Sequence, residues 1–176
     1  MSGKKAPVLM FDHIGIVTSD TDQACRQFGS TIGAVEISER FDDSALGVSV
    51  QFIRDRAGIV YEMISPLGEK SPVAKALATK TNILNQICYR TASIAEAAAE
   101  LRTLGNMPLG PAKPALAFDG ALVQFFFCRL GFVIELIEIQ AYKREIPALP
   151  GACVAVWHRF QPAATSEQNS SKTGGG

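Results

Sequence analysis

The sequence has no excess charge of either sign and no long apolar run. Lysine plus arginine equals aspartate plus glutamate, at 17 residues each in a chain of 176. A neutral balance gives no electrostatic reason to expect nucleic acid or an anionic membrane surface as a partner. No apolar stretch is long enough to span a bilayer, and the opening MSGKKAPVLMFDH lacks the apolar segment of a signal peptide. We therefore expect neither a nucleic-acid nor a membrane partner.

The sequence also lacks paired cysteines. Its four cysteines form no C-x-x-C motif, so a zinc knuckle or a thioredoxin-type motif is unsupported. Each lies among apolar neighbours, where a reduced, buried thiol that acts as a small hydrophobic side chain is the expected state. Reduced thiols in turn favour a cytoplasmic location. The four are Cys25, Cys88, Cys128 and Cys153.

An internal repeat organises the chain, of which 47% is hydrophobic and 19% charged, enough apolar material for a sizeable core. The segments FDHIGIVTSD and NQICYRTASI align at a spacing of 73 residues, which places His13 on Gln86. The same spacing places GVSVQF on GALVQF, and YEMI on IELI, so that Glu62 falls on Glu135. A match of this length at one spacing indicates a duplicated module.

Each copy reads as β-α-β-β-β. In the first copy an alternating strand over 11–18 precedes a helix that Asp20 caps and Gly33 ends. In the second copy Ser93 and Glu96 form a capping box, and Gly105 ends the helix. The strands expected after the helices are 35–40, 46–54 and 59–64 in the first copy and 107–110, 120–127 and 131–138 in the second. The predicted fold class is α+β, with tandem modules that form a shared open-barrel cleft.

The predicted boundaries follow from the repeat. The first module covers residues 10–66, and the second covers 83–141. The linker, 67–82, contains a short helix with Ser71 as N-cap and Pro72 at the first helical position. A C-terminal extension over 142–159 is followed by a tail, 160–176, that is poor in large apolar residues and is predicted to be disordered.

Four side chains stand at matched places in the two copies. His13 and Glu62 are 49 residues apart, and so are Gln86 and Glu135. If the modules pack with pseudo-two-fold symmetry, these side chains converge in one cleft. A carboxylate inside an apolar strand such as VYEMI or VIELI needs a partner, and a divalent cation facing both glutamates would supply it. The alternatives left open are a hydrogen-bonded core histidine at His13 and glutamates that face solvent.

A second matched pair is Gln51 and Gln124, each inside V-Q-F. Their amides either line the cleft and bind substrate oxygens, or mark the solvent face of the sheet. The alternation of the strands does not decide between these two interpretations.

Several motifs carry a family resemblance. H-I-G-I after an aspartate, E-M-I-S-P-L with S-P-V-A-K following, and V-I-E-L-I-E resemble the vicinal oxygen chelate superfamily, which contains glyoxalases, bleomycin-resistance proteins and dioxygenases. The similarity covers about residues 10–140 and is greatest to the methylmalonyl-CoA epimerase branch. It implies a glyoxalase-like fold, a small-molecule substrate and a homodimer.

The resemblance also implies the site chemistry. His13, Glu62, Gln86 and Glu135 fall where the superfamily has its metal ligands, for cobalt, nickel, manganese, magnesium or zinc. Glu62 and Glu135 would also be catalytic, in an isomerase, epimerase or lyase that moves a proton next to a carbonyl, with an acyl-CoA thioester such as methylmalonyl-CoA as the substrate. Gln86 departs from the usual histidine, and its amide is a weaker ligand. The alternative is a metal-free small-molecule-binding protein of the bleomycin-resistance type.

Overall fold

The computed structural model describes residues 9–80 and 83–138, and it contains one mixed β-sheet with its two longer helices on the outer face. The first half consists of β1 (Met10–Val17), α1 (Thr21–Ile32), β2 (Glu36–Ile37), β3 (Phe41–Asp43), β4 (Val48–Arg54) and β5 (Val60–Pro66). Helix α2 (Ala74–Thr79) lies between the halves. The second half consists of β6 (Leu84–Thr91), α3 (Ile94–Thr103), β7 (Met107–Pro108), β8 (Lys113–Pro114), the 3-10 helix η1 (Leu116–Phe118), β9 (Leu122–Phe127) and β10 (Val133–Glu138).

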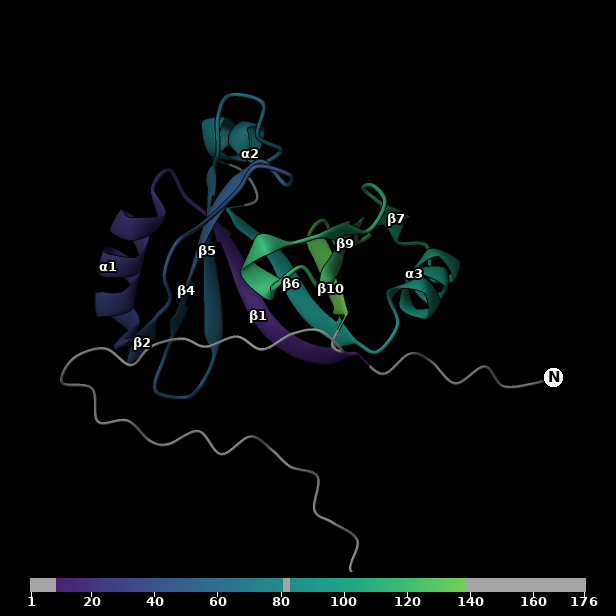
Figure 1. Ribbon diagram of the computed structural model, residues 1–176, viewed down its shortest axis with the longest axis horizontal. Coiled ribbons are helices and arrows are strands. Elements are labelled where there is room, and N and C mark those ends of the chain that lie inside the picture. Colours follow the sequence, from purple (N-terminus) through teal and green to yellow (C-terminus); the bar gives the residue numbers. More distant parts are fainter. Residues whose placement is uncertain (1–8, 81–82, 139–176) are drawn as a thin grey trace, which may run out of the picture.

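The two halves repeat one topology. Strands follow the order β2-β4-β5-β1-β6-β10-β9-β7, with β3 added beside β4 and β8 beside β9. Strand β1 runs parallel to β5, as β6 does to β10, and the halves meet where β1 and β6 pair antiparallel. The sheet curves without closing, and η1 lies in its concavity (Figure 1). The predicted α+β fold of tandem modules with an open cleft is therefore confirmed.

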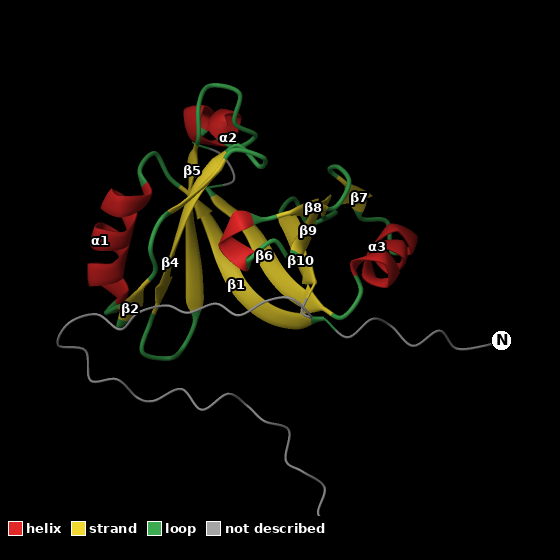
Figure 2. Ribbon diagram, viewed as in Figure 1, coloured by secondary structure: helices red, strands yellow, loops and turns green. Residues whose placement is uncertain are grey.

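Different clusters of apolar side chains cover the two faces of the sheet. Helix α1 covers the outer face of β4 and β5, where Cys25 packs with Ile53 and Met63 (Figure 2). Helix α3 covers β9 and β10 in the same way through Leu101 and Phe126. A further cluster fills the concave face, and its members include Val17, Phe52, Ile64, Phe118, Val123 and Ile137. Each such burial contributes roughly 1.5–3 kcal/mol, which holds the curved sheet between two layers of side chains.

The helix ends follow the predicted local chemistry. The Asp20 carboxylate accepts from the backbone N–H of Gln23 at 2.9 Å, and Gly33 has the left-handed backbone that ends α1. The Ser93 hydroxyl likewise accepts from the backbone N–H of Glu96 at 3.3 Å. One prediction was wrong: α2 begins at Ala74, and the Ser71 side chain does not cap it.

The short strands β3 and β8 were not predicted, since two or three residues are too few to show alternation. The predicted extension over 142–159 and the tail over 160–176 lie outside the described residues. Among the helices that the structure describes, none has the length and apolar character needed to cross a membrane.

Candidate active site

The four matched side chains come from four neighbouring strands. His13 lies on β1, Glu62 on β5, Gln86 on β6 and Glu135 on β10, and these strands are adjacent in the order β5-β1-β6-β10. Side chains alternate along a strand, so Glu62 points to the concave face with Ile64, while Met63 points to α1. All four are buried, with at most 5% of any of them exposed. Neither glutamate faces solvent.

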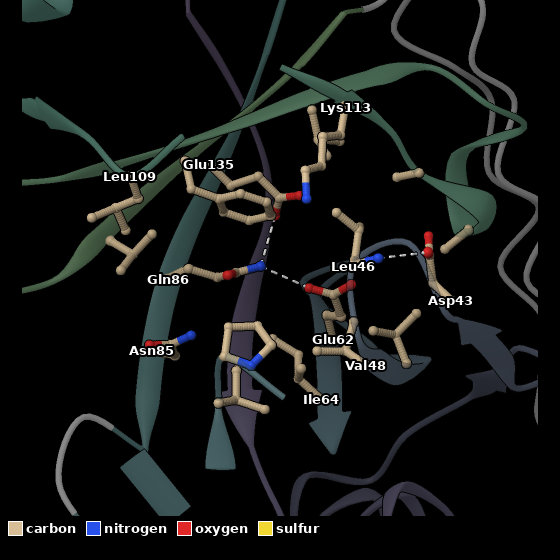
Figure 3. A pocket seen from close by; sticks show the side chains of 18 of the residues that line it. Asp43, Leu46, Val48, Glu62, Ile64, Asn85, Gln86, Leu109, Lys113 and Glu135 are labelled. Atoms are coloured by element: carbon tan, nitrogen blue, oxygen red, sulfur yellow. Dashed lines mark hydrogen bonds between the residues drawn. The ribbon is translucent and has the colours of Figure 1, made fainter. Parts of the chain in front are cut away.

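Two donors bridge the two carboxylates. The Nε2 atom of His13 lies 3.1 Å from Glu62 Oε2 and 3.4 Å from Glu135 Oε2. The Gln86 amide nitrogen donates to the same two oxygens, at 2.8 Å and 2.7 Å (Figure 3). Within each module, therefore, the two matched residues, 49 positions apart, contact each other. Gln86 also donates to Glu62 of the other module. The convergence expected from the spacing is present in the structure.

A glycine makes room for this contact. Gly15 lies opposite Glu62 on one side and opposite Gln86 on the other. A Cβ at Gly15 would stand 2.3 Å from the Cγ of Gln86, closer than real atoms come. The Gln86 side chain thus lies across the bare backbone of β1 on its way to Glu62.

Asp12 orients the histidine. Its carboxylate Oδ1 lies 2.8 Å from His13 Nδ1, and its Oδ2 lies 3.0 Å from Arg90 Nε. Adjacent residues of a regular strand point to opposite faces, but the β1–β6 ladder shifts register between Phe11 and His13, which lets both side chains meet. A carboxylate on Nδ1 fixes the N–H there and turns Nε2 toward the glutamates. Sequence reasoning missed Asp12, although its place directly before His13 was visible.

Burial and neighbouring charges set the protonation of the site. Burial raises the pKa of Glu135, the charge of Glu62 raises it further, and the His13 bond opposes both. The pKa of the Cys88 thiol is also raised well above its ordinary value, first by burial and then by the Glu135 charge, so it is uncharged at neutral pH.

His13 gains a proton more readily than a free histidine. Burial lowers its pKa, but the surrounding anionic groups outweigh that and raise the pKa well above 6.5. The groups that raise it are Cys88, Glu62 and Asp12, and of these the Cys88 thiol keeps its own proton at neutral pH. The Glu62 charge and the Asp12 hydrogen bond therefore hold the proton on His13 in the metal-free chain.

The site lies in the wall of a cavity of about 310 Å³. Glu62, Gln86 and Glu135 line it, and most of the remaining walls are apolar. These walls include Leu46, Val48, Val50, Ile64, Val73, Leu109, Ala115, Phe118, Val123, Phe125 and Val133. A few polar groups converging in an apolar cavity are typical of a small-molecule site.

Gln51 and Gln124 are not among the cavity-lining residues. Their amide nitrogens donate to backbone carbonyls instead, of Ser38 at 3.1 Å and of Gly110 at 2.8 Å. The strand neighbours Val50 and Val123 line the cavity, so alternation turns both glutamines to the other face of the sheet. The expectation that they line the cleft is therefore not supported.

The donor atoms fit one divalent cation. Adjacent ligands of an octahedral ion with bonds of about 2.1 Å stand about 3 Å apart. The nitrogen and carboxylate atoms of the four residues are separated by 2.7–3.4 Å at the contacts above. A half-turn of the Gln86 amide would place its oxygen, rather than its NH₂ group, among them. Two carboxylates would balance the charge of the ion, and Asp12 supplies the usual support behind a metal-binding histidine.

Cys88 is a neighbour of the site that sequence reasoning treated as an ordinary buried thiol. It is fully buried and lies across from both His13 and Glu135 in the sheet. Ligand atoms of these three residues lie within 4.8 Å of one another. In the repeat Cys88 occupies the place of Gly15, so a small side chain stands between the polar pairs in both modules.

The fold and the site define a duplicated open-sheet protein whose two modules share one histidine-carboxylate cleft. A family model described as the Glyoxalase/Bleomycin resistance protein/Dioxygenase superfamily matches residues 12–125, and the chain belongs to this superfamily.

Three proteins that are similar to this chain are epimerases of acyl-CoA thioesters by name. The chain is 30% identical over 131 residues to an ethylmalonyl-CoA/methylmalonyl-CoA epimerase of Cereibacter sphaeroides, covering 73% of this chain and 96% of the relative. A methylmalonyl-CoA epimerase from Mycobacterium tuberculosis superposes with a TM-score of 0.65 at 21% identity, over 76% of this chain and 90% of that one. A methylmalonyl-CoA epimerase in complex with methylmalonyl-CoA and NH₄⁺ superposes with a TM-score of 0.64 at 24% identity, over 78% and 99%. The two superpositions support the fold.

Proposed function

We propose that this protein is an epimerase that inverts the carbon next to the thioester carbonyl of an acyl-CoA, with methylmalonyl-CoA as the substrate. The observation that carries the proposal is the convergence of His13 and Gln86 on Glu62 and Glu135 in the wall of an apolar cavity. The 30% identity to the Cereibacter sphaeroides epimerase supports it. A lyase reaction has no such support among these relatives.

The two glutamates are the proposed catalytic residues. A carboxylate takes the proton from the carbon, and the electron pair of the C–H bond moves into an enolate on the thioester oxygen. Return of a proton to the opposite face completes the inversion. In the metal-free chain the pKa of Glu135 is raised, first by burial, so its carboxylate holds a proton more strongly than that of a free glutamate. Glu62 contacts the same two donors as Glu135, His13 and Gln86, and is the second carboxylate that can take or return the proton.

The proposed cofactor is a divalent cation, cobalt, nickel, manganese, magnesium or zinc. His13, Glu62, Gln86 and Glu135 would hold it. When bound, such an ion supplies Lewis-acid stabilisation of the enolate oxygen. The chain itself supplies the orientation: Asp12 holds the His13 ring, and Phe52 and Phe118 pack against that ring at centroid distances of 5.6 Å and 6.0 Å.

The test is the conversion of a single epimer of methylmalonyl-CoA into the other, measured with chelator-treated protein and again after each ion is restored. We expect turnover that depends on an ion and falls roughly 10²–10⁴-fold in Glu135→Gln, the range for loss of a positioned base. Glu138→Gln is the matched control on the same strand, because the Glu138 carboxylate accepts from the Ile94 backbone N–H, away from the cavity. Full activity in Glu135→Gln would refute the assignment.

A second candidate function is the metal-free binding protein. It is favoured by the closed network, in which His13 and Gln86 satisfy both carboxylates with donors from the chain. Tight binding of an acyl-CoA without any epimerisation, with or without added ions, would select this candidate. The homodimer and the cytoplasmic location implied at the outset remain proposals.

A further inference from the structure

Lys113 is the one basic residue among those that line the cavity in the described part of the chain. Three acidic residues share the lining, namely Asp43, Glu62 and Glu135. The Asp43 carboxylate is occupied, since it accepts from the backbone N–H groups of Ala45, Leu46 and Leu116 at 2.8–2.9 Å. Glu62 and Glu135 are bridged by His13 and Gln86. The ammonium of Lys113 makes no hydrogen bond or ion pair with another described residue.

Comparison of the two repeated halves shows that the first half has no lysine at the place equivalent to Lys113. Lys113 pairs with Val123 across β8 and β9, and Phe41 pairs with Val50 across β3 and β4. Val50 and Val123 are equivalent in the repeat and both line the cavity. The first half thus has a phenylalanine, packed against Phe52 at 6.5 Å between ring centroids, where the second has a lysine. Of the described residues that line the cavity, those of the second half alone include a positively charged side chain.

The lysine extends into the cavity on the side of Glu135 (Figure 3). An anionic group of a ligand at this place would meet the ammonium, and without the ammonium it would meet only the carboxylates. A ligand group bound beside Glu135 would also lie beside the carbon at which the proposed proton transfer takes place. A carboxylate attached to the reacting carbon is an anion in that position.

We propose that Lys113 binds the free carboxylate of the acyl group and thereby selects malonyl-type thioesters over neutral acyl thioesters. This inference rests on the proposed function, because it assumes an acyl-CoA substrate with its reacting carbon beside Glu135. Lysine presents a compact positive charge on a flexible stem. The ammonium can therefore follow the carboxylate as the carbon that carries it inverts. The same ammonium chemistry would also bind a phosphate of coenzyme A, so the experiment separates the two sources.

The test compares the dissociation constants of malonyl-CoA, acetyl-CoA and coenzyme A, measured by calorimetry on the wild type and on three variants. Malonyl-CoA and acetyl-CoA differ only by the carboxylate. Lys113→Met removes the charge, Lys113→Arg keeps it, and Lys75→Met removes an exposed lysine that does not line the cavity. We expect Lys113→Met to weaken malonyl-CoA roughly 10–100-fold, the range for a hydrogen bond to a charged group, and acetyl-CoA less than about twofold. Lys113→Arg retains most of the affinity, and Lys75→Met does not change the ratio between the two thioesters.

Equal weakening of malonyl-CoA, acetyl-CoA and coenzyme A in Lys113→Met would overturn the proposal and assign the lysine to a phosphate. Unchanged malonyl-CoA binding in Lys113→Met would overturn it as well. A wild type that prefers malonyl-CoA through Lys113 but never epimerises methylmalonyl-CoA would refute the proposed function alone. A wild type that binds neither of the two thioesters nor coenzyme A would refute both.

Discussion

Gly15 and Gln86 lie face to face on β1 and β6, so that a Cβ at Gly15 would stand 2.3 Å from the Cγ of Gln86. The missing side chain on one module is what allows the glutamine of the other to reach both glutamates. The first prediction follows from this contact. Gly15→Ala should displace Gln86 and lower the free energy of unfolding by about 1–3 kcal/mol, the range for an overpacked core, as measured by urea denaturation.

The control for Gly15→Ala is a double variant. In Gly15→Ala/Gln86→Ala the crowding is gone, so the cost of adding the Gly15→Ala change to Gln86→Ala should be much smaller than its cost in the wild type. Equal costs in the two backgrounds would show that the alanine clashes with something other than Gln86.

The second prediction concerns metal preference at Gln86. Gln86→His replaces a neutral amide with imidazole, a stronger ligand for cobalt and nickel. Affinity for these ions should rise by about tenfold or more, since even groups that only support a ligand change metal affinity by roughly 10–100-fold. Manganese and magnesium, which prefer oxygen ligands, should gain less and serve as the comparison in the same calorimetric titration. An unchanged cobalt affinity would place Gln86 outside the ligand set.

The third prediction is a loss of stability with rising pH in chelator-treated protein. The pKa of His13 is raised above 6.5 in the folded chain, so its stabilising proton is fully present below about pH 6.5 and is lost as the pH rises through the folded value. Glu135, raised above 4.5, has the same sign, because the folded state holds its proton more tightly than the unfolded state. The free energy of unfolding should therefore fall between pH 6.5 and 8, by at most about 1.4 kcal/mol per pH unit for each proton.

Urea denaturation at several pH values checks this slope, with His13→Gln as the control that keeps a donor but does not titrate. The slope should flatten in the variant. A stability that rises with pH in the wild type would contradict the protonation assigned to the site.

The fourth prediction concerns thiol reactivity. Burial, with the Asp22 charge in support and the Arg26 charge opposed, raises the pKa of Cys25 to about 12. At pH 8 almost none of it is thiolate, so alkylation by iodoacetamide should be slow. The Cys128 thiol is partly exposed and should react sooner. Peptide mapping by mass spectrometry separates the two sites, and faster labelling of Cys25 would show that α1 opens readily from the sheet.

Much of the architecture could be predicted because a duplicated sequence carries its own register. The common spacing of 73 residues is enough to group His13, Glu62, Gln86 and Glu135 from the sequence alone. Caps such as Asp20 depend on local chemistry and were equally visible.

Other features depend on details that alternation does not contain. Period-two patterns do not say which face of a strand is concave, so the sequence alone does not place Gln51 and Gln124, whose amides bind backbone carbonyls in the structure. Asp12 reaches His13 because the β1–β6 ladder shifts register at Asp12, between Phe11 and His13. Lys113 enters the cavity from a strand of two residues, too short to leave a sequence pattern.

The measurement that tests the central claim most directly is a calorimetric titration of chelator-treated protein with cobalt and with manganese, which gives the number of ions bound per chain. The four residues should bind one ion per chain. His13→Ala and Glu135→Gln should abolish or greatly weaken binding, whereas Glu138→Gln should bind as the wild type does, because Glu138 contacts the backbone at the start of α3. Binding that survives in both His13→Ala and Glu135→Gln, or no binding of any ion by the wild type, would contradict the metal site.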